Sequence, residues 1–175
     1  AWLHHAWREN GGADTEMALP GYVLPEHPVG GNAAFGSDAL ARPDLQALAR
    51  WFDAADDRLA EAVQVFPTGP LRVWPHHFDM AALWVLEGEG EEMRSVGIGF
   101  SPGDGGIAQP YHYILPWPAP GTEDLPELPA GRWQTDGFVA AVLTGADGAD
   151  NERTARTFLR EATPIVREVA LRGAE

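Results

Sequence analysis

The sequence predicts an α+β domain in which an antiparallel β-sheet of four to five strands is covered on one face by two main amphipathic helices. Three observations lead to this fold class. Residues 43–66 place apolar side chains at alternating spacings of three and four, as in a helix. Several short apolar runs with turn signals between them follow, and the helical spacing returns in residues 151–172.

The helix predicted for residues 43–66 has recognisable signals at both ends. Pro43 suits the first helical turn because that position needs no N–H donor, and Asp44 favours the positive end of the helix dipole. Pro67 then ends the helix. In the C-terminal helix, Pro164 removes a backbone hydrogen bond, and we therefore expect a kink there.

Five strands are predicted, at residues 71–74, 77–86, 93–101, 111–117 and 138–144. Residues 87–92 and 102–106 are turn-forming runs between apolar stretches, which favours an antiparallel meander. The Pro-rich residues 116–129 must leave the sheet, because proline cannot donate to a central ladder.

The length of 175 residues fits a single globular domain over residues 1–175 with a substantial core. Residues 1–9 have the spacing of the tail of a longer helix, so we expect a further N-terminal part upstream of this chain. Residues 11–37 are rich in Gly and Pro and predict an irregular segment that wraps across the surface.

Composition excludes several kinds of chemistry. The chain has no cysteine, which excludes disulfides, thiolate nucleophiles and cysteine zinc sites, and its twelve basic residues are all arginine, which excludes a lysine Schiff base. A net charge of −14 opposes binding to nucleic acid or to an anionic membrane surface. We therefore expect a cytoplasmic protein whose partner is a small-molecule ligand, and the sequence leaves the oligomeric state open.

Residues 74–79, with the sequence WPHHFD, contain the strongest candidate site, because two imidazoles and a carboxylate fall within four residues. The candidate catalytic residues are His76, His77 and Asp79. Side chains at i and i+2 of an extended strand share a face, so His77 and Asp79 should point the same way while His76 points to the other side.

Three chemical interpretations of this cluster remain open. If His112 faces the same cleft, then His77, Asp79 and His112 would suit a divalent iron, zinc or manganese ion with open coordination positions. The HFD triplet also resembles the histidine-any-aspartate element of double-stranded β-helix oxygenases. In a metal-free version, Asp79 orients a histidine that acts as general base. In the third, the histidines form a buried structural hydrogen-bond network.

A ligand pocket is predicted beside this cluster, and its candidate residues are Trp74, Ser101, Asp104, Tyr111, Tyr113, Trp117, Trp133 and Gln134. Aromatic faces with polar edges suit a planar or sugar ligand. Within residues 93–101, Gly97 and Gly99 leave one face of the strand bare, which predicts either a groove or a space filled by a bulky neighbour such as Trp84 or Trp117. Ser101 and Asp104 are also typical turn formers.

Several segments together resemble an uncharacterised bacterial protein family of unknown function: residues 25–30, WPHHFD at 74–79, SPGD at 101–104, the PYxYxxPWP pattern at 110–118, and residues 133–143. The resemblance covers the chain from about residue 20 onward, and family members are similar in having a longer N-terminal part. In that family the residue after Trp133 is often histidine, whereas this chain has Gln134, and the position of His112 is often another aromatic residue. The resemblance implies no reaction, and both departures weaken a metal site based on His112.

The functional expectation is a small-molecule enzyme, metal-assisted or metal-free, with a His/Asp site on the sheet face opposite the helices. The alternative is a non-catalytic ligand-binding or structural module with a buried histidine network and an aromatic pocket. The two expectations differ in where they place His77 and Asp79. The enzyme needs both side chains in one accessible cleft, whereas the structural module has its histidines buried.

Overall fold

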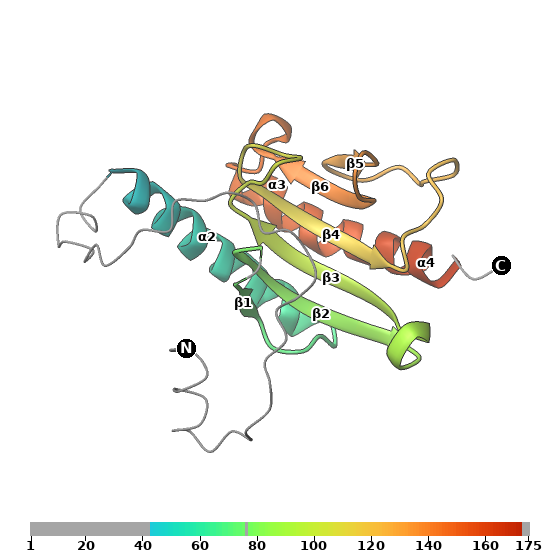
Figure 1. Ribbon diagram of the computed structural model, residues 1–175. Helices are drawn as coiled ribbons and strands as arrows, with labels where there is room; N and C mark the ends of the chain where they lie inside the picture. Colours follow the sequence, from blue (N-terminus) through green and yellow to red (C-terminus); the bar gives the residue numbers. More distant parts are fainter. Residues whose placement is uncertain (1–42, 76, 173–175) are drawn as a thin grey trace, which may run out of the picture. The chain divides into compact units, whose positions relative to one another are not determined.

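The computed structural model describes residues 43–75 and 77–172, which form an antiparallel sheet packed against helices (Figure 1). These elements belong to one compact unit within Gly36–Glu175. The helix expected at residues 1–9, the irregular segment at 11–37 and the candidate catalytic residue His76 lie outside the described residues. The extent of the domain over residues 1–175 therefore stays a prediction.

The sheet has six strands in the order β1-β2-β3-β4-β6-β5, and every neighbouring pair is antiparallel. The strands are β1 (Arg72–Trp74), β2 (Asp79–Glu87), β3 (Arg94–Ser101), β4 (Tyr111–Trp117), β5 (Arg132–Gln134) and β6 (Ala140–Thr144). The α+β prediction is confirmed, with one strand more than expected. The additional strand, β5, has only three residues, which is too short for a period-2 pattern to show in the sequence.

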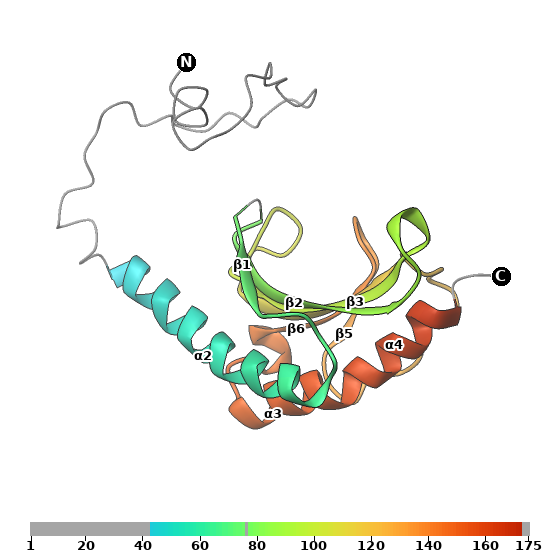
Figure 2. The ribbon, with the colours of Figure 1, turned by 90° about the horizontal axis from the view of Figure 1, so that it is seen from below.

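The helices are α2 (Pro43–Val65) and a C-terminal run made of α3 (Glu152–Thr157), the π-helical turn η4 (Phe158–Ala162) and α4 (Thr163–Arg172). Two short 3-10 turns, η2 (Gly90–Glu92) and η3 (Gly145–Asp147), lie in connections between these elements. Figure 2 shows α2 and the C-terminal helices together on one side of the sheet. No helix in the described part of the chain is both long and apolar enough to cross a membrane.

The C-terminal helix is irregular just before Pro164, where a kink was expected, and the irregularity takes the form of the π-helical turn η4. Pro164 has no N–H for the carbonyl four residues earlier, and its ring crowds that carbonyl. A wider turn relieves both problems. The Thr163 hydroxyl donates to the Leu159 carbonyl at 2.6 Å, which satisfies one acceptor within this turn.

The main core lies between the helices and one face of the sheet. Alternate residues of β3, namely Val96, Ile98 and Phe100, are fully buried and point toward the helices. They pack against Leu59 of α2 and Phe158 of η4, which are also fully buried. This alternation places the intervening residues of β3 on the opposite face of the sheet.

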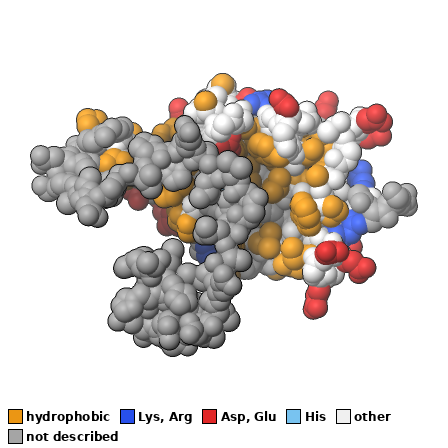
Figure 3. All heavy atoms as spheres, in the orientation of Figure 1, with side chains coloured by type: hydrophobic (Ala, Val, Ile, Leu, Met, Phe, Trp, Pro, Cys, Tyr) orange, Lys and Arg blue, Asp and Glu red, His pale blue; other side chains and the backbone are white. Residues whose placement is uncertain are grey.

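That opposite face has no helix over it among the described residues, and the sheet curves so that this face is concave (Figure 2). Apolar side chains gather on it over the central strands (Figure 3). Leu83, Val85 and Trp117 are 39, 50 and 52 % exposed. The fold therefore separates a helix-covered face, which makes the core, from an open face with room for a site.

Candidate functional site

A cleft of about 300 Å³ opens on the concave face of the sheet. Its lining residues are His77, Asp79, Ser101, Asp104, Tyr111, Tyr113, Leu115 and Phe138. The cleft therefore brings together most of the polar residues selected from the sequence. Asp79 begins β2 and His77 lies in the turn before it, Ser101 and Asp104 come from the end of β3 and its loop, and the tyrosines come from β4.

His77 and Asp79 both line the cleft, but not because they alternate along one strand as expected. β2 begins only at Asp79, and His77 lies in the preceding turn. Between them Phe78 adopts a left-handed backbone conformation with φ of +53°, which is uncommon for a residue with a bulky side chain. The Phe78 ring packs against Phe52 of α2 at a centroid distance of 5.4 Å, which helps to hold this conformation. Such backbone outliers cluster at functional sites.

Tyr113 spans the floor of the cleft. Its ring lies over Gly99 of β3, and its hydroxyl donates to Oδ2 of Asp79 on β2. A Cβ atom at Gly99 would lie 2.5 Å from Tyr113 Oη and 2.7 Å from Cε1, so only glycine leaves space for the ring. The bare strand face predicted at Gly99 is thus filled by a bulky neighbour, although the neighbour is Tyr113 rather than Trp84 or Trp117.

Asp104 is the second carboxylate in the cleft, and both of its oxygens already accept hydrogen bonds. Oδ1 accepts the backbone N–H groups of Gly106 at 2.7 Å and Ile107 at 2.8 Å, while Oδ2 accepts the Tyr111 hydroxyl at 2.6 Å. Partial burial acts to raise the pKa of Asp104, but the bonds from Tyr111, Ile107 and Gly106 and the nearby charge of His77 together lower it. Asp104 is therefore an ionised turn-organising residue that also presents negative charge to the cleft.

Both tyrosines keep their protons across the physiological range. Burial raises the pKa of Tyr111 and of Tyr113, and the hydrogen bonds to Asp104 and Asp79 raise them further. Each hydroxyl is thus a permanent donor to one carboxylate. The result is two tyrosine–aspartate pairs on neighbouring walls of one cleft.

Asp79 differs from Asp104 in that one of its carboxylate oxygens, Oδ1, accepts no hydrogen bond from the described residues. Its side chain is 9 % exposed, and Oδ1 is buried with no hydrogen-bond partner among the described residues. Leaving a buried acceptor unpaired costs about 1–3 kcal/mol, and more for a charged group. Because native structures rarely leave such groups unpaired, this oxygen marks a position where a ligand donor would be favourable.

Ser101 is buried and belongs to the turn rather than to a nucleophilic arrangement. Its Oγ accepts the backbone N–H of Gly103 at 3.2 Å. Gly103 has a positive φ of +115° and continues the turn toward Asp104. This matches the turn-forming interpretation of Ser101.

The prediction that His112 shares the cleft with Asp79 is wrong. His112 pairs with Phe100 across the β3–β4 ladder and lies on the helix-covered face, fully buried beside Arg58, whose Nη1 lies 3.3 Å from His112 Nε2. Burial, followed by the charge of Arg58, lowers the pKa of His112 to about 3, so the ring is neutral. A metal set of His77, Asp79 and His112 cannot converge through the sheet, and no group of three His, Cys, Asp or Glu side chains within residues 43–75 and 77–172 is arranged to hold a metal ion.

Four predicted pocket residues do not line the cleft. Trp133 packs against the main core and donates from Nε1 to the Pro126 carbonyl at 2.7 Å, and Gln134 donates to the Asp136 carbonyl at 2.7 Å. Trp74 and Trp117 are 40 and 52 % exposed and are not among the residues that line this cleft, although Trp74 pairs with Asp79 in the β1–β2 ladder. Large aromatic residues alone do not predict a pocket, because most of them serve the core.

Comparison with known protein families, with curated proteins and with solved structures gives no match for this chain. The resemblance based on the WPHHFD, SPGD and PYxYxxPWP segments therefore stays a prediction. The chemistry of the cleft has to be argued from its own residues.

Leu115 and Phe138 line the cleft but are absent from the residues selected on the sequence. Leu115 could have been found, because it follows Tyr111 and Tyr113 at the period of two that places residues of one strand on one face. Phe138 was expected to begin the strand at residues 138–144, but β6 begins only at Ala140, so Phe138 lies in the connection before it. The lining thus combines polar side chains with two apolar ones.

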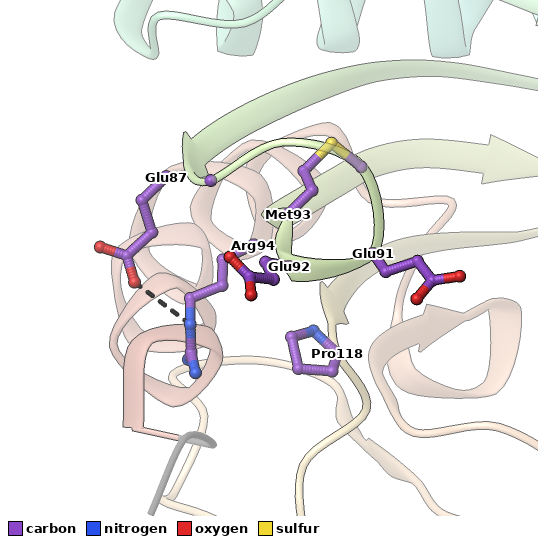
Figure 4. Close-up of a pocket in the computed structure, with 7 residues that line it drawn as sticks. Glu87, Glu91, Glu92, Met93, Arg94 and Pro118 are labelled. Atoms are coloured by element: carbon purple, nitrogen blue, oxygen red, sulfur yellow. Dashed lines mark ion pairs between the residues drawn. The ribbon is translucent and has the colours of Figure 1, made fainter.

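A larger and shallower pocket of about 520 Å³ lies at the connection between β2 and β3 (Figure 4). Glu87, Glu91, Glu92 and Arg94 are among its lining residues, and Arg94 already has partners within the protein. The Arg94 guanidinium pairs with Glu87 at 3.1 Å and donates to the last carbonyls of α4, at 2.6 Å for Ala170. These contacts fasten the hairpin to the helix end, and the acidic side chains alone do not indicate a ligand.

Proposed function

We propose that the cleft on the concave sheet face binds a small organic molecule, and that the ligand donates a hydrogen bond to the carboxylate of Asp79. The observation that carries this proposal is the buried, unpartnered Oδ1 of Asp79, a residue that lines a cleft of about 300 Å³. A ligand donor at this oxygen would recover the cost of about 1–3 kcal/mol that an unpaired buried acceptor imposes.

The rest of the cleft supports a pocket that is formed before the ligand arrives. Tyr113 holds Asp79 and Tyr111 holds Asp104, so both carboxylates have fixed positions. Preorganised polar groups lose little entropy on binding, which favours affinity. The volume of about 300 Å³ is at the small end of the range for small-molecule pockets.

A second candidate function is a small-molecule enzyme that transfers protons with His77 and Asp79. The observation that favours it is the position of His77, which is exposed at the cleft and close enough to Asp104 for its charge to lower the pKa of that carboxyl. A histidine titrates near neutral pH and can both take and return a proton. In this scheme Asp79 holds the substrate and His77 exchanges the proton.

The test is a screen of small fragments by ligand-observed NMR against three proteins: the unmodified chain, Asp79→Asn, and the control Asp57→Asn. Asp57 lies exposed on α2, so the control makes the same chemical change away from the cleft. We expect fragments that bind the unmodified chain and Asp57→Asn and lose at least tenfold in affinity for Asp79→Asn. Fragments that bind all three proteins equally, or an absence of binding fragments, would refute the proposal.

A further inference from the structure

We propose that the ligand of this cleft is a cation, a small molecule in which a protonated amine or amidinium group is attached to a compact apolar or aromatic body. This inference rests on the proposed function and adds the chemical class of the ligand. It follows from three properties of the cleft: the charge of its lining, the kind of hydrogen bond that it lacks, and the nature of its walls.

Among the described residues, the lining carries two carboxylates and no arginine. Asp79 and Asp104 both face the cleft, and His77 is the one residue with a basic side chain among the residues that line it. The chain as a whole has a net charge of −14, so the surrounding field adds to the local one. A concave site lined by one sign of charge concentrates ligands of the opposite sign.

The hydrogen bond that Oδ1 of Asp79 lacks requires a donor group on the ligand. A carboxylate oxygen accepts hydrogen bonds, and Oδ2 of Asp79 already accepts from Tyr113, so the unpaired acceptor Oδ1 needs an N–H or O–H group. A hydrogen bond in which either partner is charged is roughly twice as strong as one between neutral groups. An ammonium or amidinium donor adds the attraction between two opposite charges, so it gains more at Oδ1 than a neutral hydroxyl or amide does.

The walls suit the rest of such a ligand. The rings of Tyr111 and Tyr113 lie 6.2 Å apart at an angle of 52°, and Phe138 adds a third aromatic ring. Aromatic faces attract cations, and the attraction increases when the cation is partly desolvated. Leu115 supplies an aliphatic surface for the body of the ligand. No described group in the cleft offers an anionic ligand a full positive charge apart from His77 when it is protonated.

The experiment uses three probes of matched shape: benzylamine, which is a cation at pH 7.5, benzyl alcohol, which is neutral, and benzoate, which is an anion. Each probe is titrated into the ¹⁵N-labelled full chain and the affinity is taken from chemical-shift changes. We expect benzylamine to bind at least tenfold more tightly than benzyl alcohol, and benzoate more weakly than both. Asp79→Asn should reduce the ratio of benzylamine to benzyl alcohol to near one, whereas Asp57→Asn should leave it unchanged.

A second variant locates the binding. Phe138→Ala removes a partly exposed ring from the cleft wall and leaves the charges in place, so it should weaken benzylamine and benzyl alcohol together. If Phe138→Ala changes neither affinity, the probes bind elsewhere and the inference is wrong. This variant remains informative if Asp79→Asn does not fold.

The outcomes separate this inference from the proposed function. If benzyl alcohol binds as tightly as benzylamine, the cationic ligand is refuted while the proposed function stands. If benzoate, which has no donor, binds best, both are refuted. If benzylamine binds equally to the chain and to Asp79→Asn, only the overall charge attracts it, and the inference fails. If none of the three probes binds, the inference is refuted, and the fragment screen alone decides the proposed function.

Discussion

Replacing Gly99 by alanine should open the Tyr113–Asp79 pair, because the new Cβ would occupy the position of the Tyr113 ring. That Cβ would lie 2.5 Å from Oη and 2.7 Å from Cε1, well inside van der Waals contact. The conflict involves the end of a side chain that borders a cleft, so the ring can rotate away. The main cost is then the hydrogen bond to a charged carboxylate, which is worth about 2 kcal/mol.

Gly97→Ala is the matched control, two residues earlier on the same face of β3. Its Cβ would lie 3.7 Å from Leu115 Cβ, an ordinary contact. Alanine has less freedom than glycine in the unfolded chain, so this variant should be neutral or slightly stabilising. We expect Gly99→Ala to lower the melting temperature by roughly 4–8 °C for a protein of this size and Gly97→Ala not to lower it.

The assay is thermal unfolding followed by circular dichroism, combined with a double-mutant cycle. In a Tyr113→Ala background the obstructing ring is absent, so Gly99→Ala should cost little. Equal melting temperatures for Gly99→Ala and Gly97→Ala would refute the argument. An undiminished cost of Gly99→Ala without the Tyr113 ring would show that the glycine is needed for its backbone rather than for the ring.

Two further predictions concern the helix-covered face. Arg58→Met should reduce the free energy of unfolding by about 3 kcal/mol, because the buried Arg58 donates to the Ala149 carbonyl at 3.1 Å and pairs with Glu152 at 2.8 Å. The control Arg160→Met removes an exposed arginine that pairs with Glu161, and it should cost less than about 1 kcal/mol. Similar costs in urea unfolding would contradict this. The second prediction concerns pH. The pKa of His112 is about 3 in the folded chain and near its ordinary value of 6.5 in the unfolded chain. Between pH 3 and pH 6.5 the unfolded chain therefore binds more protons than the folded chain. The stability from the neutral ring is complete above pH 6.5 and falls as the pH decreases toward 3, with a slope of up to about 1.4 kcal/mol per pH unit. His112→Gln should show a shallower slope between pH 4 and 6, and equal slopes would refute the assignment.

Much of the architecture was accessible from local patterns. The alternating threes and fours of α2 and the alternation of bulky residues with Gly and Ser in β3 report directly on the face that each residue presents to the core. The cluster at residues 74–79 also drew attention to His77 and Asp79, which both line the cleft. These signals are readable because they depend on the geometry of a single element.

The sequence alone could not assign the faces of β4. Tyr111 and Tyr113 alternate with His112 and Ile114, so both faces of the strand carry large side chains and the period of two does not say which is covered. The register decided it, because pairing of His112 with Phe100 places the histidine against the helices. A shift by one residue would exchange every side chain between the two faces.

The local sequence by itself therefore determined the helices, the meander of strands and the residues near which a site was expected. Only the tertiary structure decided that Tyr113 crosses Gly99 to hold Asp79, that His112 is buried beside Arg58, and that Oδ1 of Asp79 is left unpaired. The physical reason is that hydrogen bonds and clefts depend on strand register and on a single left-handed residue at Phe78, and neither has a periodic signature in the sequence.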